Sequence, residues 1–532
     1  MKNAVNMIRL NKLRGGEKVE ENISAKNNSI EERLLEKENI IMFTGCLALG
    51  FLFNYLFCWK ALGVSYPLFI LAFYGVLIWS LRKTISFKLD FAWLLSIPIL
   101  ALSLTYFIFS NIIFMVLNFI SVPILIFIQT TLLAKKNRYE WYSLRFIQDV
   151  IHSIFVKTLV DIPRPFEIFA GIAARKGKSK KTVVTSKVVI GLLISVPLLL
   201  LIFMLLSSAD QVFQHYTENV FKFLNNINIV PDEALARTFI ILVFSFIFFS
   251  YFWNMLYSKI SEATEKENLA ARVTDNIIMI TVLISINLVY IFFVVIQFTY
   301  LFGGANYALP QSITHSEYAR RGFFELVTVT LINLSVLLVS LNFTKKGSKI
   351  SSRILKILNA LLVVCTAIML YSAHFRMSLY EQAYGYTYLR ILTHAFMILI
   401  FAFLLAALYK IWSDKFSLVK AYIIIALTAY VILNYVNIDV IISKNNFERY
   451  HKTKQIDVGY LGFLSYDAVP WLIELMHDKN KEIAVEAQNI LVWKKEDINR
   501  TNEWQSFNIS KYRAKLQLSK FNLEFQETGH ER

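Results

Sequence analysis

Apolar segments of about twenty residues recur along most of this 532-residue sequence, separated by shorter polar stretches. A helix needs about twenty apolar residues to cross the hydrocarbon core of a bilayer. The sequence therefore predicts an all-α integral membrane protein, a polytopic bundle of about eleven transmembrane helices. The expected spans are 40–59, 62–81, 91–110, 111–134, 188–207, 235–257, 277–301, 323–343, 354–374, 390–412 and 419–438.

The charge pattern agrees with a membrane protein. Only 17% of residues are charged, whereas about 25% is usual in soluble proteins. The net charge of +17 would suggest nucleic acid in a soluble chain, but here the basic residues lie in short loops between apolar spans. We therefore expect the lipid bilayer and anionic phospholipid headgroups as partners, and no nucleic acid.

The loops also predict an orientation. With the N-terminus inside, the inner loops are 82–88, 135–187, 258–272, 344–353 and 413–415, and all of them are basic. The outer loop 209–233 is not basic, although the outer loop 307–322 contains Arg320 and Arg321. Positive charge marks the cytoplasmic side, so we expect the N-terminus in and the C-terminus out in a cytoplasmic (plasma) membrane.

This topology divides the chain into five regions. They are a disordered cytoplasmic tail (1–39), spans one to four (40–134), a cytoplasmic amphipathic helix and basic loop (135–187), spans five to eleven (188–438) and an extracytoplasmic helical region (439–532). In the last region we expect short amphipathic helices at 468–476, 481–493 and 504–518.

The long inner loop contains an apolar stripe followed by a basic run. The stripe either lies along the inner membrane surface or packs under the bundle. Its members are Trp141, Leu144, Ile147, Val150, Ile151, Ile154 and Phe155. The basic run is expected to contact anionic lipid and comprises Arg175, Lys176, Lys178, Lys180 and Lys181.

The central thirds of the expected spans contain no Asp, Glu, Lys or Arg. This argues against a proton relay at the bilayer midplane. The polar residues that do occur there, Asn287, Asn333 and Asn359, are expected to join neighbouring helices. Neither GxSxG nor HExxH occurs, so an enzyme is unsupported, and no metal or cofactor is predicted.

Ionisable and aromatic residues instead gather at the outward ends of the spans. They indicate either a polar chamber for an anionic ligand or structural ion pairs beside an aromatic belt. A metal site would need closer histidine spacing than the sequence has. The candidate ligand-binding residues are Asp210, His315, Glu317, Tyr318, Arg320, Arg321, Glu325, Arg376, Tyr384, Arg390 and His394.

Several segments at these turns resemble a bacterial multi-pass family catalogued as domain of unknown function 4173, with its relative 4153. Those at the outward turns are YALPQSITHSEYARRGFFEL (307–326), SSADQVF (207–213) and YGYTYLR (384–390). Those beyond the bundle are NIDVIISKNNFERY (437–450), DVGYLGFLSYDAVPWL (457–472) and SFNISKYRA (506–514). Gln211 stands where the family commonly has proline. The family has no established activity, so the resemblance implies a topology and a site but no substrate.

Two functional hypotheses follow. The first is transport or handling of an anionic solute or lipid through the outward-facing chamber. The alternative is a non-transporting envelope sensor or assembly protein, whose extracytoplasmic C-terminal helices bind an envelope protein partner.

Overall fold

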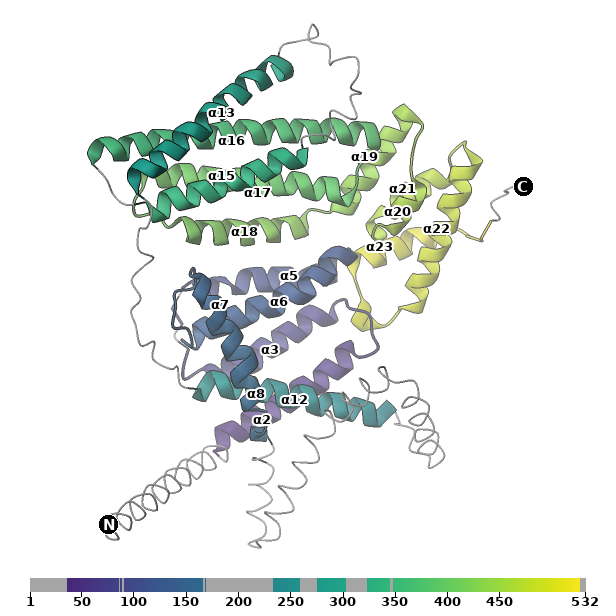
Figure 1. The fold of residues 1–532 in the computed structure, drawn as a ribbon. Coiled ribbons are helices and arrows are strands. Elements are labelled where there is room, and N and C mark those ends of the chain that lie inside the picture. Colours follow the sequence, from purple (N-terminus) through teal and green to yellow (C-terminus); the bar gives the residue numbers. More distant parts are fainter. Residues whose placement is uncertain are drawn as a thin grey trace, which may run out of the picture. The chain divides into compact units, whose positions relative to one another are not determined.

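The computed structural model describes residues 36–85, 87–88, 90–165, 168, 233–258, 275–302, 323–344 and 348–526. Across these ranges the regular structure is helical, so the all-α prediction is confirmed (Figure 1). Nine of the described helices are long and apolar enough to cross a membrane, and Ser65–Leu81 is a shorter apolar helix. The expected span 188–207 lies outside the described residues, and the count of eleven is not confirmed.

The chain forms two compact units, and the first comprises Met1–Leu94 and Leu125–Ile260. Its described helices are α2 (Lys37–Phe57), α3 (Ser65–Leu81), α4 (Phe91–Leu94), the last part of α6 (Ile112–Leu133), α7 (Leu144–Ile151), the π-helix η1 (His152–Lys157), α8 (Thr158–Val160) and α12 (Glu233–Tyr257).

Helices α2 and α12 pack closely in this unit. A Cβ atom at Gly50 would lie 2.1 Å from the Ser245 hydroxyl and 2.5 Å from the Ile241 carbonyl oxygen, so only glycine fits there. The rings of Phe53 and Phe244 stack beside this contact, with centroids 3.8 Å apart. Small residues at such crossings let membrane helices approach closely enough for packing to hold them together.

The apolar stripe predicted in residues 141–155 is divided between two environments. Leu144, Ile147, Ile151 and Phe155 are exposed on α7 and η1, whereas Val150 is buried. Trp141 stacks on Phe91, with ring centroids 3.7 Å apart. An exposed apolar face at helical spacing favours the membrane-surface interpretation over packing under the bundle.

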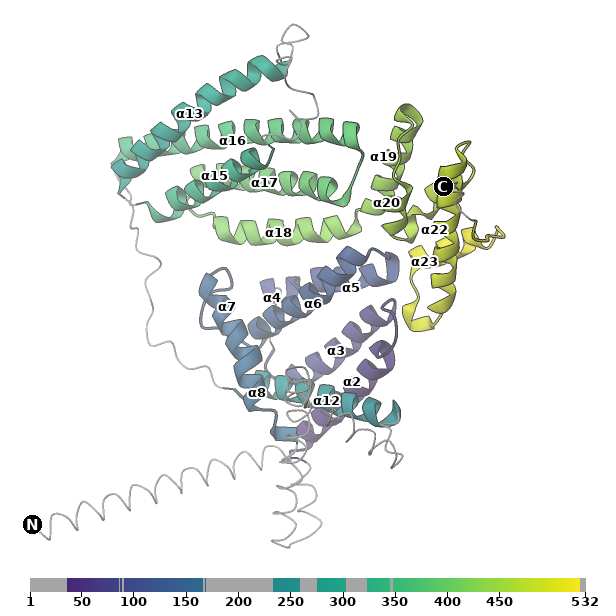
Figure 2. The same cartoon turned by 45° about the vertical axis from the view of Figure 1, so that its right-hand side comes forward.

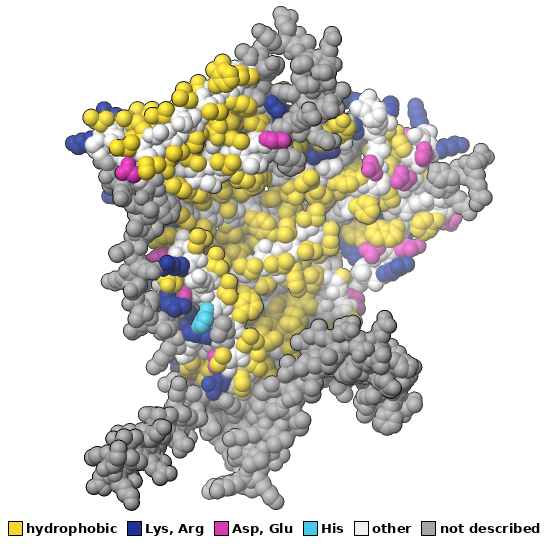
Figure 3. Space-filling model, in the orientation of Figure 1, with side chains coloured by type: hydrophobic (Ala, Val, Ile, Leu, Met, Phe, Trp, Pro, Cys, Tyr) yellow, Lys and Arg dark blue, Asp and Glu magenta, His cyan; other side chains and the backbone are white. Residues whose placement is uncertain are grey.

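The second unit comprises Leu95–Ile124 and Ser261–Arg532. Its apolar helices are α5 (Ser96–Ile108), the first part of α6, α13 (Asn276–Phe302), α15 (Phe323–Phe343), α16 (Lys349–Tyr384), α17 (Tyr388–Trp412) and α18 (Leu418–Tyr435). In the space-filling view, hydrophobic side chains dominate the visible face of α13 and the helices beside it (Figure 3). Such a surface suits contact with lipid tails.

Hydrogen bonds join three of these helices at the predicted asparagines. The Asn287 amide donates to the Leu358 carbonyl oxygen at 3.0 Å, and the Asn333 amide donates to the Thr366 hydroxyl at 2.9 Å. The Asn359 amide donates to the Ser340 hydroxyl at 2.9 Å. These bonds link α13 and α15 to α16, which confirms the expected role of the three side chains.

Helix α16 is longer than the predicted span 354–374. Its 36 residues would extend about 54 Å, well beyond a hydrocarbon core about 30 Å thick. The segment 375–384, expected as an outward turn, therefore continues the helix. A hydropathy window misses this extension because Arg376 and Glu381 interrupt it.

The C-terminal region is also helical and lies at one end of α16, α17 and α18 within the second unit (Figure 2). It contains α19 (Ile438–Thr453), α20 (Val458–Phe463), η3 (Tyr466–Ala468), α21 (Val469–Met476), α22 (Lys481–Arg500), η4 (Trp504–Ser506) and α23 (Ile509–Leu518). The last three α-helices overlap the expected amphipathic segments, but α22 continues past residue 493 to Arg500, and the segment 504–518 is divided into η4 and α23. Helices α19 and α20 were not expected.

Candidate functional site

The turn between α16 and α17 carries the described part of the predicted chamber. Helix α16 ends at Tyr384, and Gly385 follows with a φ of +87°. A Cβ atom at Gly385 would lie 2.7 Å from the Asn446 side-chain oxygen. Both the backbone conformation and the close approach of α19 therefore require glycine at this position.

Two side chains of α19 hold this turn. Asn446 accepts a hydrogen bond from the Tyr386 amide and donates one to the Tyr386 carbonyl oxygen, both at 2.8 Å. The Arg449 guanidinium donates to the carbonyl oxygens of Ala383 at 2.6 Å and Gln382 at 3.1 Å. A cation there satisfies carbonyl groups that the end of a helix leaves without partners.

Arg390, predicted to bind a ligand, also contacts this turn. Its guanidinium donates to the Gly385 carbonyl oxygen and lies 4.5 Å from the centre of the Tyr380 ring. The Tyr380 ring in turn packs against the ring of Tyr384, with centroids 4.8 Å apart. These contacts favour a structural role for Arg390.

Glu381, His374 and His394 form a compact group, which we call the histidine–glutamate cluster. Nε2 of His394 lies 3.0 Å from a Glu381 carboxyl oxygen, and the Nδ1 atoms of His394 and His374 are 2.8 Å apart. The other Glu381 oxygen is buried without a hydrogen-bond partner among the described residues. Among the described residues, neither this cluster nor any other group of three or more His, Cys, Asp or Glu side chains has the geometry to hold a metal ion.

The other predicted site residues are not gathered into this group. Arg376 is buried on α16, and Glu325 is exposed in the first turn of α15. The remaining candidates lie outside the described residues, so the ligand-binding chamber and the basic lipid-contact run stay predictions. These candidates are Asp210, His315, Glu317, Tyr318, Arg320, Arg321, Arg175, Lys176, Lys178, Lys180 and Lys181.

A second polar centre, which sequence reasoning missed, surrounds Asp439 in the first turn of α19. The Asp439 side chain is fully buried. Its carboxyl oxygens accept hydrogen bonds from the Tyr388 hydroxyl and, at 2.8 Å, from the Asn111 amide. Asn111 also accepts from the Phe114 amide at 3.1 Å, which caps the start of α6. We call Asn111, Tyr388 and Asp439 the Asp439 junction, because they join α6, α17 and α19.

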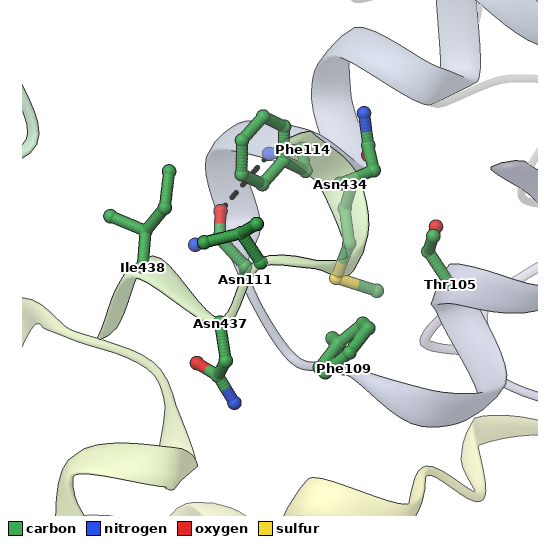
Figure 4. Close-up of a pocket in the computed structure, with 9 residues that line it drawn as sticks. Thr105, Phe109, Asn111, Phe114, Asn434, Asn437 and Ile438 are labelled. Carbon is green, nitrogen blue, oxygen red and sulfur yellow. Dashed lines mark hydrogen bonds between the residues drawn. The ribbon is translucent and has the colours of Figure 1, made fainter. Parts of the chain in front are cut away.

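Amide side chains extend the junction toward the membrane helices. Asn118 of α6 donates to the Asn434 side-chain oxygen of α18 at 2.7 Å and to the Thr105 hydroxyl of α5 at 3.0 Å. A cavity of about 10 Å³ lies beside this network, lined in part by Asn111, Asn434 and Thr105 (Figure 4). It has room for about one water molecule and is too small for a solute.

Two further charged residues of the C-terminal region, the buried Lys494 and the partly buried Asp467, have shifted pKa values. Lys494 of α22 donates to the Leu464 carbonyl oxygen at 2.8 Å. Burial lowers the pKa of Lys494 to about 8, although Asp439 and Asp497 favour its charged form. Burial also raises the pKa of Asp467, while hydrogen bonds from the Ser510 and Asn437 side chains oppose that shift.

The C-terminal region also caps the end of α5. The Asn508 amide donates to the carbonyl oxygens of Tyr106, at 2.8 Å, and Phe109. The hydroxyls of Ser110 and Ser510 lie 2.9 Å apart, and Ser110 accepts from the Tyr466 amide at 3.2 Å. These bonds make the region part of the second unit's structure and not a loose tail.

One signal could have located two of the three junction residues. Tyr388 and Asp439 fall in different family-like segments, 384–390 and 437–450, and Tyr466 and Asn508, which contact the end of α5, fall in two more. Residues from all of these segments lie in one packed region of the structure.

A family model described as Domain of unknown function (DUF4153) matches residues 96–475. Of the two related families that the sequence resembles, this is the one matched. The matched range contains the three residues of the Asp439 junction and the histidine–glutamate cluster. No curated protein and no solved structure matches the chain.

Proposed function

From the premise that this chain belongs to the DUF4153 family, we propose that it is a membrane-embedded sensor or assembly protein acting through its C-terminal helices. The Asp439 junction carries this proposal, because it couples the ends of α6 and α17 to α19. A shift of either membrane helix would change the hydrogen bonds of a fully buried carboxyl group. Such a network can transmit a movement between the bundle and its C-terminal region.

We further propose that the protein lies in the plasma membrane of a bacterium, with its N-terminus inside and its C-terminus outside. The basic loops predicted on the inner side support this orientation. The partner would then be another envelope protein, bound outside the cytoplasm.

Exposed aromatic side chains offer a surface for such a partner. Phe463 of α20 is 86% exposed and Trp493 of α22 is 57% exposed, and these two helices pack together. Aromatic residues are enriched at protein interfaces, where they bury a large area on binding.

Co-purification from native membranes tests this proposal. We expect wild-type protein to retain an envelope partner that the double variant Phe463→Ser, Trp493→Ser loses, while its unfolding temperature stays unchanged. The variant Trp412→Ser removes a similarly exposed aromatic side chain from the C-terminal end of α17 and should retain the partner. Equal retention by the double variant would contradict the proposal. Deleting residues 448–532 is a poorer test, because it also removes Arg449 from the α16–α17 turn.

The histidine–glutamate cluster favours a second candidate function, the handling of an anionic solute or lipid near the α16–α17 turn. The Glu381 oxygen without a described partner would accept a hydrogen bond from a donor on the ligand, such as the O–H of a hydrogen phosphate. Hydrogen phosphate should then stabilise the purified protein against heat more than sulfate, which has no such donor, and the difference should be lost in Glu381→Leu. Arg390→Ala is a less selective variant, since it also removes the contact with Gly385. The absence of stabilisation by any compound would count against this candidate.

A further inference from the structure

A groove in the C-terminal region lies apart from both polar centres. It has a volume of about 400 Å³ and is formed by the end of α22, η4 and α23. The lining combines basic and aromatic side chains, among them Trp504, Phe507, Lys511, Tyr512 and Lys515.

Contacts with α5 place the groove beside the end of a membrane span. The Phe507 ring packs against the ring of Phe107, with centroids 5.8 Å apart. Asn508, also in the lining, donates to the carbonyl oxygens of Tyr106 and Phe109. Because the candidate span Phe91–Ile108 ends at this point, the groove lies at the depth where hydrocarbon gives way to lipid headgroups.

The side chains of the groove match the chemistry of that depth. Trp504, Tyr512 and Leu516 are each about half exposed, and tryptophan and tyrosine are typical of the membrane–water interface. Lysine near the end of a span can extend its ammonium group to the headgroups while its stem contacts apolar surface.

The positive charge of α23 favours an anionic headgroup. The helix carries Lys511, Arg513 and Lys515 and no acidic residue. Lys511 donates to the Thr501 hydroxyl, and Lys515 donates to the Asn502 side-chain oxygen at 3.0 Å. Each ammonium group has three protons, so both lysines retain donors for a phosphate. One carboxylate, Glu503, also lies in the lining, which leaves a surplus of one positive charge.

We propose that this groove binds the headgroup of an anionic phospholipid from the adjacent leaflet. The lipid phosphate lies between Lys511 and Lys515, and Trp504 and Tyr512 contact the glycerol region. The bound lipid thereby attaches the C-terminal helices to the membrane surface. This site goes beyond the proposed function, because it needs neither a protein partner nor a transported solute.

Binding of short-chain lipids to the delipidated full-length protein in detergent tests the proposal. We expect phosphatidylglycerol to bind at least tenfold more tightly than phosphatidylcholine or inorganic phosphate. The double variant Lys511→Gln, Lys515→Gln should lose at least tenfold in affinity for phosphatidylglycerol. Trp504 reports the location: the fluorescence change on lipid binding should be smaller in Trp504→Phe.

The control variant is Arg513→Gln, which removes a charge from the same helix at a position outside the groove lining. Its affinity should stay within about twofold of wild type. If the double variant unfolds, Lys515→Gln alone and the charge-retaining Lys511→Arg provide the comparison. Equal binding of both lipids, phosphate binding as tight as lipid binding, or unchanged affinity in Lys515→Gln would overturn the proposal.

Discussion

The buried carboxyl group of Asp439 joins three helices through hydrogen bonds. It lies directly after a membrane span, and both of its oxygens accept hydrogen bonds from other helices. A buried acceptor of this kind is costly to remove, because the Tyr388 hydroxyl loses its acceptor and the Asn111 amide keeps only its bond to the Tyr388 hydroxyl. The residue therefore fixes where α6 and α17 meet the C-terminal region.

Replacing Asp439 by alanine should lower the free energy of unfolding by about 3 kcal/mol, because two buried donors lose an acceptor. Denaturant unfolding in detergent measures the change. Glu474→Ala removes an exposed carboxylate from α21 and should cost less than about 0.5 kcal/mol. A similar small cost for Asp439→Ala would show that the junction relaxes easily.

Lys494 gives the fold a specific pH dependence. Its pKa is about 8 in the folded state and 10.5 when unperturbed. Below about pH 8 both states are charged and the cost of the buried charge is fully present. Between about pH 8 and 10.5 the unfolded state binds more protons, so stability rises with pH.

We therefore expect wild-type protein to gain stability relative to Lys494→Met between pH 8 and 10.5. The gain should be about 3 kcal/mol, since each unit of pKa corresponds to about 1.4 kcal/mol. The difference between the two unfolding curves should be constant below about pH 7. Parallel curves across the whole range would mean that Lys494 titrates normally.

At the scale of elements, α7 and η1 have an unusual surface. Their exposed apolar residues repeat every three or four positions, and the buried Asp149 of α7 pairs with Arg138 at 2.9 Å. The ion pair and the buried Val150 hold one side of the helix on the protein. The apolar side is left for the membrane interface.

Labelling two positions of α7 tests this arrangement. With the native cysteines replaced, a spin label at Ile147→Cys should be accessible to oxygen in the bilayer and protected from a water-soluble nickel chelate. Arg145→Cys is also exposed but lies about 160° around the helix from Ile147, and it should show the opposite preference. Aqueous accessibility at both positions would show that the stripe does not touch lipid.

At the scale of the whole molecule, the second unit constrains the topology. Five helix ends contact or lead into the C-terminal region. They are the C-terminal ends of α5, α16 and α18 and the N-terminal ends of α6 and α17. These ends must therefore lie on one side of the membrane. The alternation of helices in the predicted topology meets this condition.

If that side is outside, a phosphatase fused after Phe525 should be active in cells, and one fused at Lys415 should be inactive. Green fluorescent protein at the same positions should give the reverse result, since it folds poorly after export. The reverse pattern at both positions would place the C-terminus in the cytoplasm.

Hydropathy could predict the helical spans because each is a local pattern of about twenty residues. The same reasoning failed at the end of α16, where Arg376 and Glu381 interrupt the apolar run without ending the helix. The sequence predicted that polar residues gather near the α16–α17 turn. It did not predict the role of each residue. From the sequence alone Arg390 is interpreted as a ligand-binding residue, whereas the structure shows its guanidinium bonded to the Gly385 carbonyl oxygen.

The Asp439 junction was beyond sequence reasoning for a different reason. Asn111 lies 328 residues from Asp439 along the chain, and Tyr388 lies 51 residues away. An aspartate in the first turn of a helix is common, because it interacts favourably with the helix dipole. Only the fold distinguishes such a residue from one that joins three helices.

The cap that Asn508 places on α5 also sets an order of events during synthesis. Asn508 follows Tyr106 by 402 residues, so a ribosome adding about 5–20 residues per second makes it roughly 20–80 s later. Throughout that interval the end of α5 lacks its final hydrogen-bond donors. A nascent chain halted before Asn508 would present this uncapped end to the quality-control proteases of the membrane.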